Sequence, residues 1–390
     1  MLFALDLIGF LIIASFLGTL FLLNQFARIP MSMQSIGIVF ALVLWGIASL
    51  LQKQLVYRHY RWNGIVGCFT LYLWIACLWS FNPVQSIRYT IVFTTGALWL
   101  VLLSSYPFQK KHIVALYGMM MFGAVWQGIQ LFLPHAQIYY RAFLYGVLRG
   151  DYMLFRTLAF PRIESSIGGS NSLGGWYAVL FTLCAPVIIF QNYFWEKASF
   201  WRNFLSILLQ ILGAACLIVF LFVVVMSGSR GSFISVALSL LLIWLLRQAW
   251  YKAFLYLLVG GASLFVPSIR RGIQYVYSGI ADKARYIIWQ NSWEISKLVP
   301  LTGVGLGNFQ PVYTYLFQEP FQHAHNIFLN VLVELGYPGL IGFVWLAVSF
   351  MVFGLERCRQ QKDRFWYGVE LGLTVTVFGY LLRCLVDYTI

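Results

Sequence analysis

Two histidines near the carboxyl end of the chain, His323 and His325, are the first candidates for chemistry. They stand in the segment "FQHAHNIFLNVLVELGYPGLIGF", at the mouth of an otherwise apolar run. Imidazole can accept a proton from a hydroxyl group at neutral pH, so a histidine here could act as a general base. The alternative is a structural histidine that only makes hydrogen bonds, and the segment alone leaves both interpretations open.

A polar stripe follows the histidines along the same segment. If a helix begins near His325, then Asn326, Asn330 and Glu334 share one face, because residues four apart in a helix are neighbours. Polar side chains within a membrane span face the interior of the bundle rather than lipid. We therefore expect this stripe to point into the protein.

Two arginines could bind an anion. Arg230 lies in "MSGSRGS" between two apolar runs, and Arg285 lies in "ARYIIWQNSWEIS", where a helix would put Trp289, Trp293 and Ser296 on its face. A guanidinium group suits phosphate oxygens, and the small residues around Arg230 could offer amide donors. The alternatives are an arginine that snorkels to lipid headgroups and a helix anchored at the interface by aromatic residues.

The sequence lacks the motifs of several other functions. The glycines of "GVGLGNF" (303–309) have no following Lys-Ser or Lys-Thr and no βαβ context, so a sharp turn fits them better than a nucleotide site. The sequence has no HExxH, CxxC or DxD pair that would indicate a metal site, and we expect neither a metal nor a cofactor. The six cysteines do not form a disulfide framework.

The composition is that of a membrane protein. Of 390 residues, 61% are hydrophobic and only 10% are charged. Runs of about 17 to 25 apolar residues recur, long enough to cross a bilayer as helices and too long for barrel strands. The formal charge of +14 falls largely on short loops, where it sets topology rather than indicating nucleic-acid binding.

The pattern predicts eleven spans in an all-α polytopic protein. Clusters of Lys and Arg recur at every second loop, which puts the amino terminus in the cytoplasm and two long loops outside. The predicted spans are 2–23, 31–51, 64–80, 88–106, 113–133, 174–191, 204–226, 232–249, 253–266, 326–354 and 367–386. The predicted divisions are N-terminal helices (1–133), a periplasmic loop (134–173), central helices (174–266), a large periplasmic loop (267–325) and C-terminal helices (326–390).

The order of these motifs resembles that of the O-antigen ligase and Wzy polymerase superfamily. The matching stretches are "SGSRG", "ARYIIW", "PLTGVGLGNF" and "HAHNIFLNVLVELGYPGLIGF", within about residues 220–350, with a less distinct match in "RTLAFPRIESSIGGSNSLGGWYA". The resemblance implies a GT-C-like bundle in the bacterial inner membrane with its active site facing the periplasm. Family members usually have twelve spans, so the resemblance implies eleven or twelve here.

The resemblance also assigns roles to residues. Arg230 and Arg285 would bind the diphosphate of an undecaprenyl-diphosphate-linked glycan donor, and His325 would activate the hydroxyl of the acceptor. The remaining candidates would support these three: His323, Asn326, Arg156 and Trp289.

The reaction implied is the transfer of a glycan to lipid A–core without a metal, and direct attack would invert the anomeric centre. The nearest alternative is a polymerase whose acceptor is a second lipid-linked glycan, and a protein O-oligosaccharyltransferase would use serine or threonine. A lipid-linked glycan flippase would show paired half-repeats, which this sequence lacks. A peptidoglycan polymerase would use a carboxylate base in its outer loop.

Overall fold

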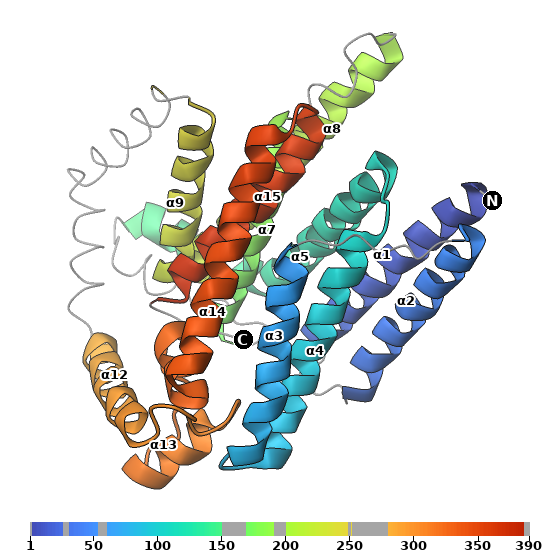
Figure 1. The fold of residues 1–390 in the computed structure, drawn as a ribbon. Coiled ribbons are helices and arrows are strands. Elements are labelled where there is room, and N and C mark those ends of the chain that lie inside the picture. The colour runs from blue at the N-terminus through green and yellow to red at the C-terminus, as the bar shows by residue number, and fades with distance from the viewer. Residues whose placement is uncertain are drawn as a thin grey trace. The chain divides into compact units, whose positions relative to one another are not determined.

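The computed structural model describes residues 2–25, 31–53, 61–149, 169–190, 200–248, 251 and 280–385. Within these ranges the chain forms helices and no strand, which confirms the predicted all-α class (Figure 1). The helices are α1 (Leu2–Gln25), α2 (Met31–Leu51), α3 (Arg61–Ala76), η1 (Cys77–Trp79), α4 (Pro83–Ser105), α5 (Lys110–Arg149), α7 (Ser170–Phe190), α8 (Phe200–Met226), α9 (Arg230–Leu246), α12 (Ile280–Leu298), α13 (Phe309–Phe317), α14 (Ile327–Gln360) and α15 (Arg364–Arg383).

The membrane spans agree with the sequence pattern. Seven helices in the described ranges are long and apolar enough to cross a bilayer, and three shorter apolar helices cover 4–17, 37–51 and 230–246. Together they account for ten of the eleven predicted spans, and the eleventh, 253–266, lies outside the described residues. The chain is therefore a polytopic membrane protein. Helix α5 continues to Arg149, so the first part of the segment predicted as an outer loop is helical.

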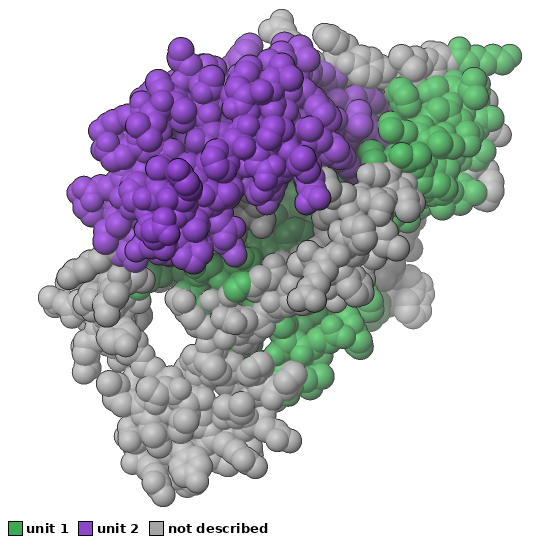
Figure 2. All heavy atoms as spheres, turned by 90° about the horizontal axis from the view of Figure 1, so that it is seen from below, with its two compact units in different colours: residues 1–56, 106–236, 357–380 green, residues 57–105, 237–356, 381–390 purple. Residues whose placement is uncertain are grey.

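The helices form two compact units, shown in separate colours in Figure 2. Arg230 lies in unit 1, whereas Arg285, His323 and His325 lie in unit 2. Unit 1 comprises residues 1–56, 106–236 and 357–380, and unit 2 comprises residues 57–105, 237–356 and 381–390.

Polar bonds join the helices of unit 1. The Tyr177 hydroxyl of α7 donates to the Ala124 carbonyl of α5 at 2.7 Å, and the hydroxyls of Thr182 in α7 and Thr376 in α15 lie 3.0 Å apart. The hydrophobic effect contributes little to helix association in lipid, because lipid tails are as apolar as the side chains. Such hydrogen bonds and close packing therefore hold the helices together.

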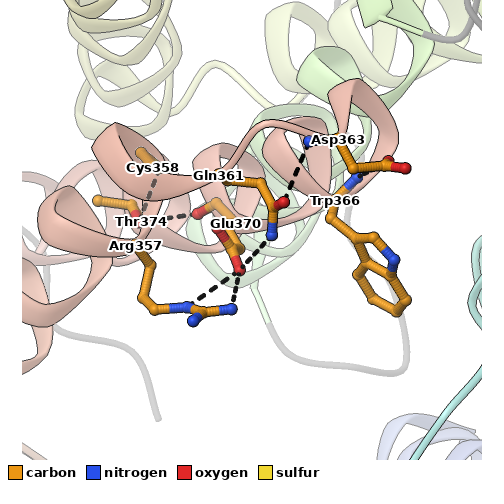
Figure 3. Close-up of polar contacts among 7 residues, drawn as sticks. All are labelled: Arg357, Cys358, Gln361, Asp363, Trp366, Glu370 and Thr374. Atoms are coloured by element: carbon orange, nitrogen blue, oxygen red, sulfur yellow. Dashed lines mark hydrogen bonds and ion pairs between the residues drawn. The ribbon is translucent and has the colours of Figure 1, made fainter.

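A polar cluster closes the turn between α14 and α15 (Figure 3). Arg357 donates to Glu370 Oε1 through Nε at 3.1 Å and Nη2 at 2.7 Å, and Gln361 adds a third donor at 3.3 Å. Asp363 Oδ1 accepts the backbone N–H of Phe365 at 3.0 Å and that of Trp366 at 3.2 Å. Asp363 therefore caps the start of α15, satisfying amides that have no partner within the helix.

An apolar core in unit 2 packs α12, α13 and the beginning of α14 together. Ala324, the residue between the two histidines, is fully buried in this core, so the histidine segment is attached to it. The buried members of the core are Ile288, Ile295, Val304, Phe309, Val312, Tyr313, Ala324 and Val333. A second core packs Phe69, Leu73 and Ala76 of α3 against Leu335 of α14.

Candidate functional site

Helix α14 is broken shortly after its start. Gly336 has φ 67° and ψ −173°, which are not helical angles, and Pro338 follows two residues later. Because Pro338 has no N–H, it cannot donate to the carbonyl of Glu334 four residues earlier. The break therefore leaves backbone carbonyls of α14 in need of partners from elsewhere.

The segment before α13 supplies those partners. The N–H of Val304 donates to the Val333 carbonyl at 2.9 Å, and the N–H of Gly305 donates to the Glu334 carbonyl at 2.8 Å. From α3, the Tyr72 hydroxyl donates to the carbonyl of Leu335 at 2.5 Å. In the opposite direction, the N–H of Tyr337 donates to the carbonyl of Pro300 at 2.8 Å. The broken helix and this segment thus complete each other's hydrogen bonding.

Glycines make this approach possible. Gly303, Gly305 and Gly307 have φ angles of 63°, 96° and 77°, so the sharp turn predicted for this segment is confirmed. A Cβ atom on Gly303 would lie 2.4 Å from the Glu334 carbonyl carbon. We call residues 303–308 the glycine loop.

The glycine loop also rests on the start of α4. Asn308 is buried at the end of the loop and donates from Nδ2 to the hydroxyls of Ser80 at 2.8 Å and Ser86 at 2.9 Å. Gln85 donates to the carbonyl of Gly307 at 2.5 Å. The loop is therefore fixed between α4 and α14.

The two histidines lie in a tight turn before α14, which we call the histidine loop (residues 321–326). The backbone N–H of His325 donates to Nδ1 of His323 at 3.2 Å, and the ring centroids lie 4.3 Å apart, edge to face. His325 has φ 53°, in the left-handed region that residues other than glycine seldom occupy. Such a conformation persists only where the surroundings hold it, and it is common at functional sites.

The far end of the histidine loop is anchored to the end of α15. Asn326 caps α14 by accepting the N–H of Leu329 at 3.1 Å, and its own amide donates to the Leu385 carbonyl at 3.0 Å. The N–H of Ile327 donates to the Cys384 carbonyl at 2.9 Å. Asn326 thus positions the start of α14 with both ends of its side chain.

The predicted polar stripe is confirmed for its two inner members. Asn330 is 2% exposed and Glu334 is 6% exposed, so both face the protein interior. Asn330 Oδ1 accepts the N–H of Ala324 at 3.1 Å. Glu334 Oε1 accepts the N–H of Phe309, the first residue of α13, at 3.2 Å. The stripe therefore contacts the histidine loop at one end and the glycine loop with α13 at the other.

Helix α12 places Arg285 and Trp289 at the edge of the unit 2 core. Both are half-buried, and Ile288 between them is fully buried. The face predicted to carry Arg285, Trp289, Trp293 and Ser296 is only partly buried: Trp293 is 44% exposed, whereas Ser296 is buried. Four residues turn the helix about 40° more than one full turn. After two such steps, Trp293 therefore lies about 80° around the helix from Arg285.

Arg230 begins α9 in unit 1, directly after a turn built from small residues. Ser227 Oγ accepts the N–H of Ser229 at 3.2 Å, and Ser229 Oγ accepts the N–H of Ser232 at 3.4 Å. Gly174 of α7 packs against this turn, where a Cβ atom would meet Ser227. The expectation that the serine amides are offered to an anion is wrong for Ser229 and Ser232, because both bond within the turn. The Arg230 side chain is partly exposed.

Arg156, the remaining candidate, lies outside the described residues. Within the part of the chain that the structure describes, no three His, Cys, Asp or Glu side chains are grouped so that they could hold a metal ion.

Sequence reasoning missed the break in α14 and the contacts that it creates. The signal was present in "GYPG", where proline follows glycine by two residues inside an apolar run. It also missed the carbonyls of Cys384 and Leu385, because a backbone acceptor leaves no mark on the sequence.

Comparison with known families gives one match. The O-antigen ligase family model matches residues 214–344, about one third of the chain. No curated protein matches the chain. The matched region begins in α8, ends beyond the break in α14 and contains Arg230, Arg285 and both histidines. The resemblance seen in the motifs is thereby confirmed: residues 214–344 are similar to the O-antigen ligase family.

Proposed function

We propose that the protein is an O-antigen ligase-type glycosyltransferase of the bacterial inner membrane. It would transfer a glycan from undecaprenyl diphosphate to lipid A–core at the periplasmic face of a GT-C-like bundle. The observation that carries this proposal is the histidine loop. In it, His325 is held in a left-handed conformation between two anchored ends, inside the region matched by the O-antigen ligase family.

His325 would act as the general base. The oxygen of the acceptor hydroxyl forms a bond to the anomeric carbon of the donor sugar while its proton passes to the imidazole of His325. The bond between that carbon and the phosphate oxygen breaks, and undecaprenyl diphosphate leaves with the bonding electrons. A single displacement of this kind inverts the anomeric centre.

Arg285 and Arg230 would bind the diphosphate. Negative charge grows on the leaving phosphate in the transition state, and guanidinium groups already in place stabilise it without a metal. The half-buried position of Arg285 beside Trp289 supports this role, because partial burial strengthens the interaction of a cation with phosphate. The energy for transfer comes from the sugar–phosphate bond of the donor.

One experiment tests both the reaction and the acceptor. Purified protein is given a lipid-linked glycan together with either lipid A–core or a second lipid-linked glycan, and the products are separated by mass. We expect transfer to lipid A–core and loss of transfer in His325→Ala. Transfer only to the second lipid-linked glycan would replace the ligase assignment by a Wzy-type polymerase. Normal turnover in His325→Ala would reject this histidine as the base.

A further inference from the structure

The carboxylate of Glu334 is buried at the meeting point of three segments. It accepts the N–H of Phe309 at 3.2 Å and also interacts with the backbone N–H of Gly307 and the side chain of Asn330. All three partners present hydrogen-bond donors, and an ionised carboxylate only accepts. The surroundings of Glu334 therefore match a carboxylate and not an amide of the same shape.

Asn330 continues this network toward the histidines. Its Oδ1 accepts the N–H of Ala324 at 3.1 Å, which leaves its amide nitrogen to donate to Glu334. Because one neighbour is a donor and the other an acceptor, only one orientation of the Asn330 amide satisfies both. A path of polar contacts thus runs from the start of α13, through Glu334 and Asn330, to the residue between His323 and His325.

The path ends next to a residue with an unusual backbone angle. The Ala324 methyl group is fully buried and its N–H is fixed by Asn330, so this residue cannot rotate freely. The following residue, His325, has φ 53°. A non-glycine residue holds such an angle only when neighbouring contacts determine it. The fixed Ala324 amide is one contact of this kind.

We propose that Glu334 and Asn330 are positioning residues that hold His325 in the orientation needed to take a proton from the acceptor. The proposal rests on His325 being the base. Glu334 is suited to this task because its backbone carbonyl accepts the N–H of Gly305 and its carboxylate accepts the N–H of Phe309, so its main chain is fixed to the glycine loop and its side chain to the start of α13.

The test compares Glu334→Gln and Asn330→Ala with wild type. Glutamine would turn one NH₂ group toward a donor, and alanine would leave the Ala324 N–H without its acceptor. We expect kcat to fall about 10- to 100-fold in each variant, as for a displaced catalytic group. The KM for the donor should stay within about twofold, because the diphosphate contacts are unchanged.

The matched control is Thr182→Ala, which removes a partly buried hydrogen bond between α7 and α15 in unit 1. It should lower thermal stability about as much as the test variants but leave kcat near wild type. If Thr182→Ala lowers kcat as strongly as Glu334→Gln, then loss of stability alone explains the effect and the proposal fails.

A second readout needs no turnover. Diethyl pyrocarbonate modifies exposed neutral imidazole rings, and mass spectrometry gives its rate at His325. Both test variants should change this rate several-fold, whereas Thr182→Ala should not. An unchanged rate together with unchanged kcat would overturn the positioning role even where His325→Ala is inactive. If His325→Ala stays active, the proposed function fails instead, so the two failures are distinguishable.

Discussion

At the scale of single residues, the two histidines have different tasks. His323 presents Nδ1 as an acceptor to the backbone of His325, which places any proton of a neutral His323 ring on Nε2. His325 has the unusual backbone angle and the proposed chemical role. His323 therefore holds the backbone of His325, and His325 is the residue proposed to take part in the reaction.

This difference can be tested with two substitutions at one position. His323→Asn keeps a polar acceptor close to the place of Nδ1, whereas His323→Ala removes it and leaves the His325 N–H without a partner, at a cost of about 1–3 kcal/mol. We expect glycan transfer near the wild-type rate in the asparagine variant and about tenfold slower in the alanine variant. Equal loss in both variants would show that the ring itself, and not the hydrogen bond, is required.

At the scale of elements, the break in α14 determines where the glycine loop can rest. A continuous helix would use the Val333 carbonyl to accept the N–H of Tyr337, and the glycine loop would lose the acceptor that Val304 now has. Gly336 allows the break because only glycine adopts φ 67° without cost, and its neighbours at Pro300 and Leu301 leave no room for a side chain.

Gly336→Ala should therefore destabilise the protein. The backbone angles of Gly336 (φ 67°, ψ −173°) cost an alanine about 1–3 kcal/mol, and the contact with the Pro300 carbonyl oxygen at 2.7 Å from the new Cβ adds to it. Gly96→Ala in α4 is the control, because nothing lies within 4 Å of its Cβ position and alanine favours a helix. Thermal unfolding in detergent should show a lower Tm only for Gly336→Ala. An unchanged Tm would mean that α14 can adopt another path.

The turn between α14 and α15 gives a pH-dependent test. Burial favours the protonated form of Asp363, but the hydrogen bond from Lys110, the backbone amides of α15 and the charge of Lys110 outweigh it and lower the pKa of this carboxyl. A lowered pKa in the folded state adds stability above the pKa of the unfolded chain, and this stability is lost as pH falls through the folded value. The Asp363 contribution is thus present at neutral pH and absent in strong acid.

Asp363→Ala should lower the Tm at pH 7, since loss of a helix cap costs about 1 kcal/mol. The difference from wild type should start to shrink below about pH 4, where the unfolded chain takes up this proton, and should vanish as the pH falls through the lower pKa of the folded carboxyl. Thermal unfolding scans at pH 7 and at about pH 2.5 measure both. A difference of the same size at both pH values would contradict the assigned role of the charge.

At the scale of the whole molecule, the sequence predicted the class of protein and most of its helices because lipid imposes a simple rule. Each span must be apolar and about 20 residues long, so composition alone reveals it. Ten of the eleven predicted spans coincide with apolar helices. The candidate site could be predicted from the sequence only in part. His325, Asn330 and Glu334 could be chosen by type and spacing, but the bonds between Asn330 and Ala324 and between Glu334 and Phe309 depend on tertiary packing.

The predicted topology also belongs to this scale. Positive charge at every second loop predicts that Lys362 lies in the cytoplasm and that Glu319, before the histidine loop, lies outside. Both side chains are exposed. In spheroplasts, a membrane-impermeant maleimide should label Glu319→Cys, and it should label Lys362→Cys only after the membrane is permeabilised. The unsubstituted protein, which carries Cys68 in an exposed position, measures the background. Labelling of Lys362→Cys in intact spheroplasts would reverse the proposed orientation.

The anchor of the histidine loop on Cys384 and Leu385 has a consequence for biosynthesis. Leu385 is made 59 residues after Asn326, the residue that it binds. A nascent chain that has emerged as far as α14 already carries the arginines, the glycine loop and both histidines. It still lacks the acceptors that hold the start of α14 in place. Assembly of the histidine loop therefore has to wait for insertion of α15, and a chain arrested before that helix would lack this anchor although every family motif is present.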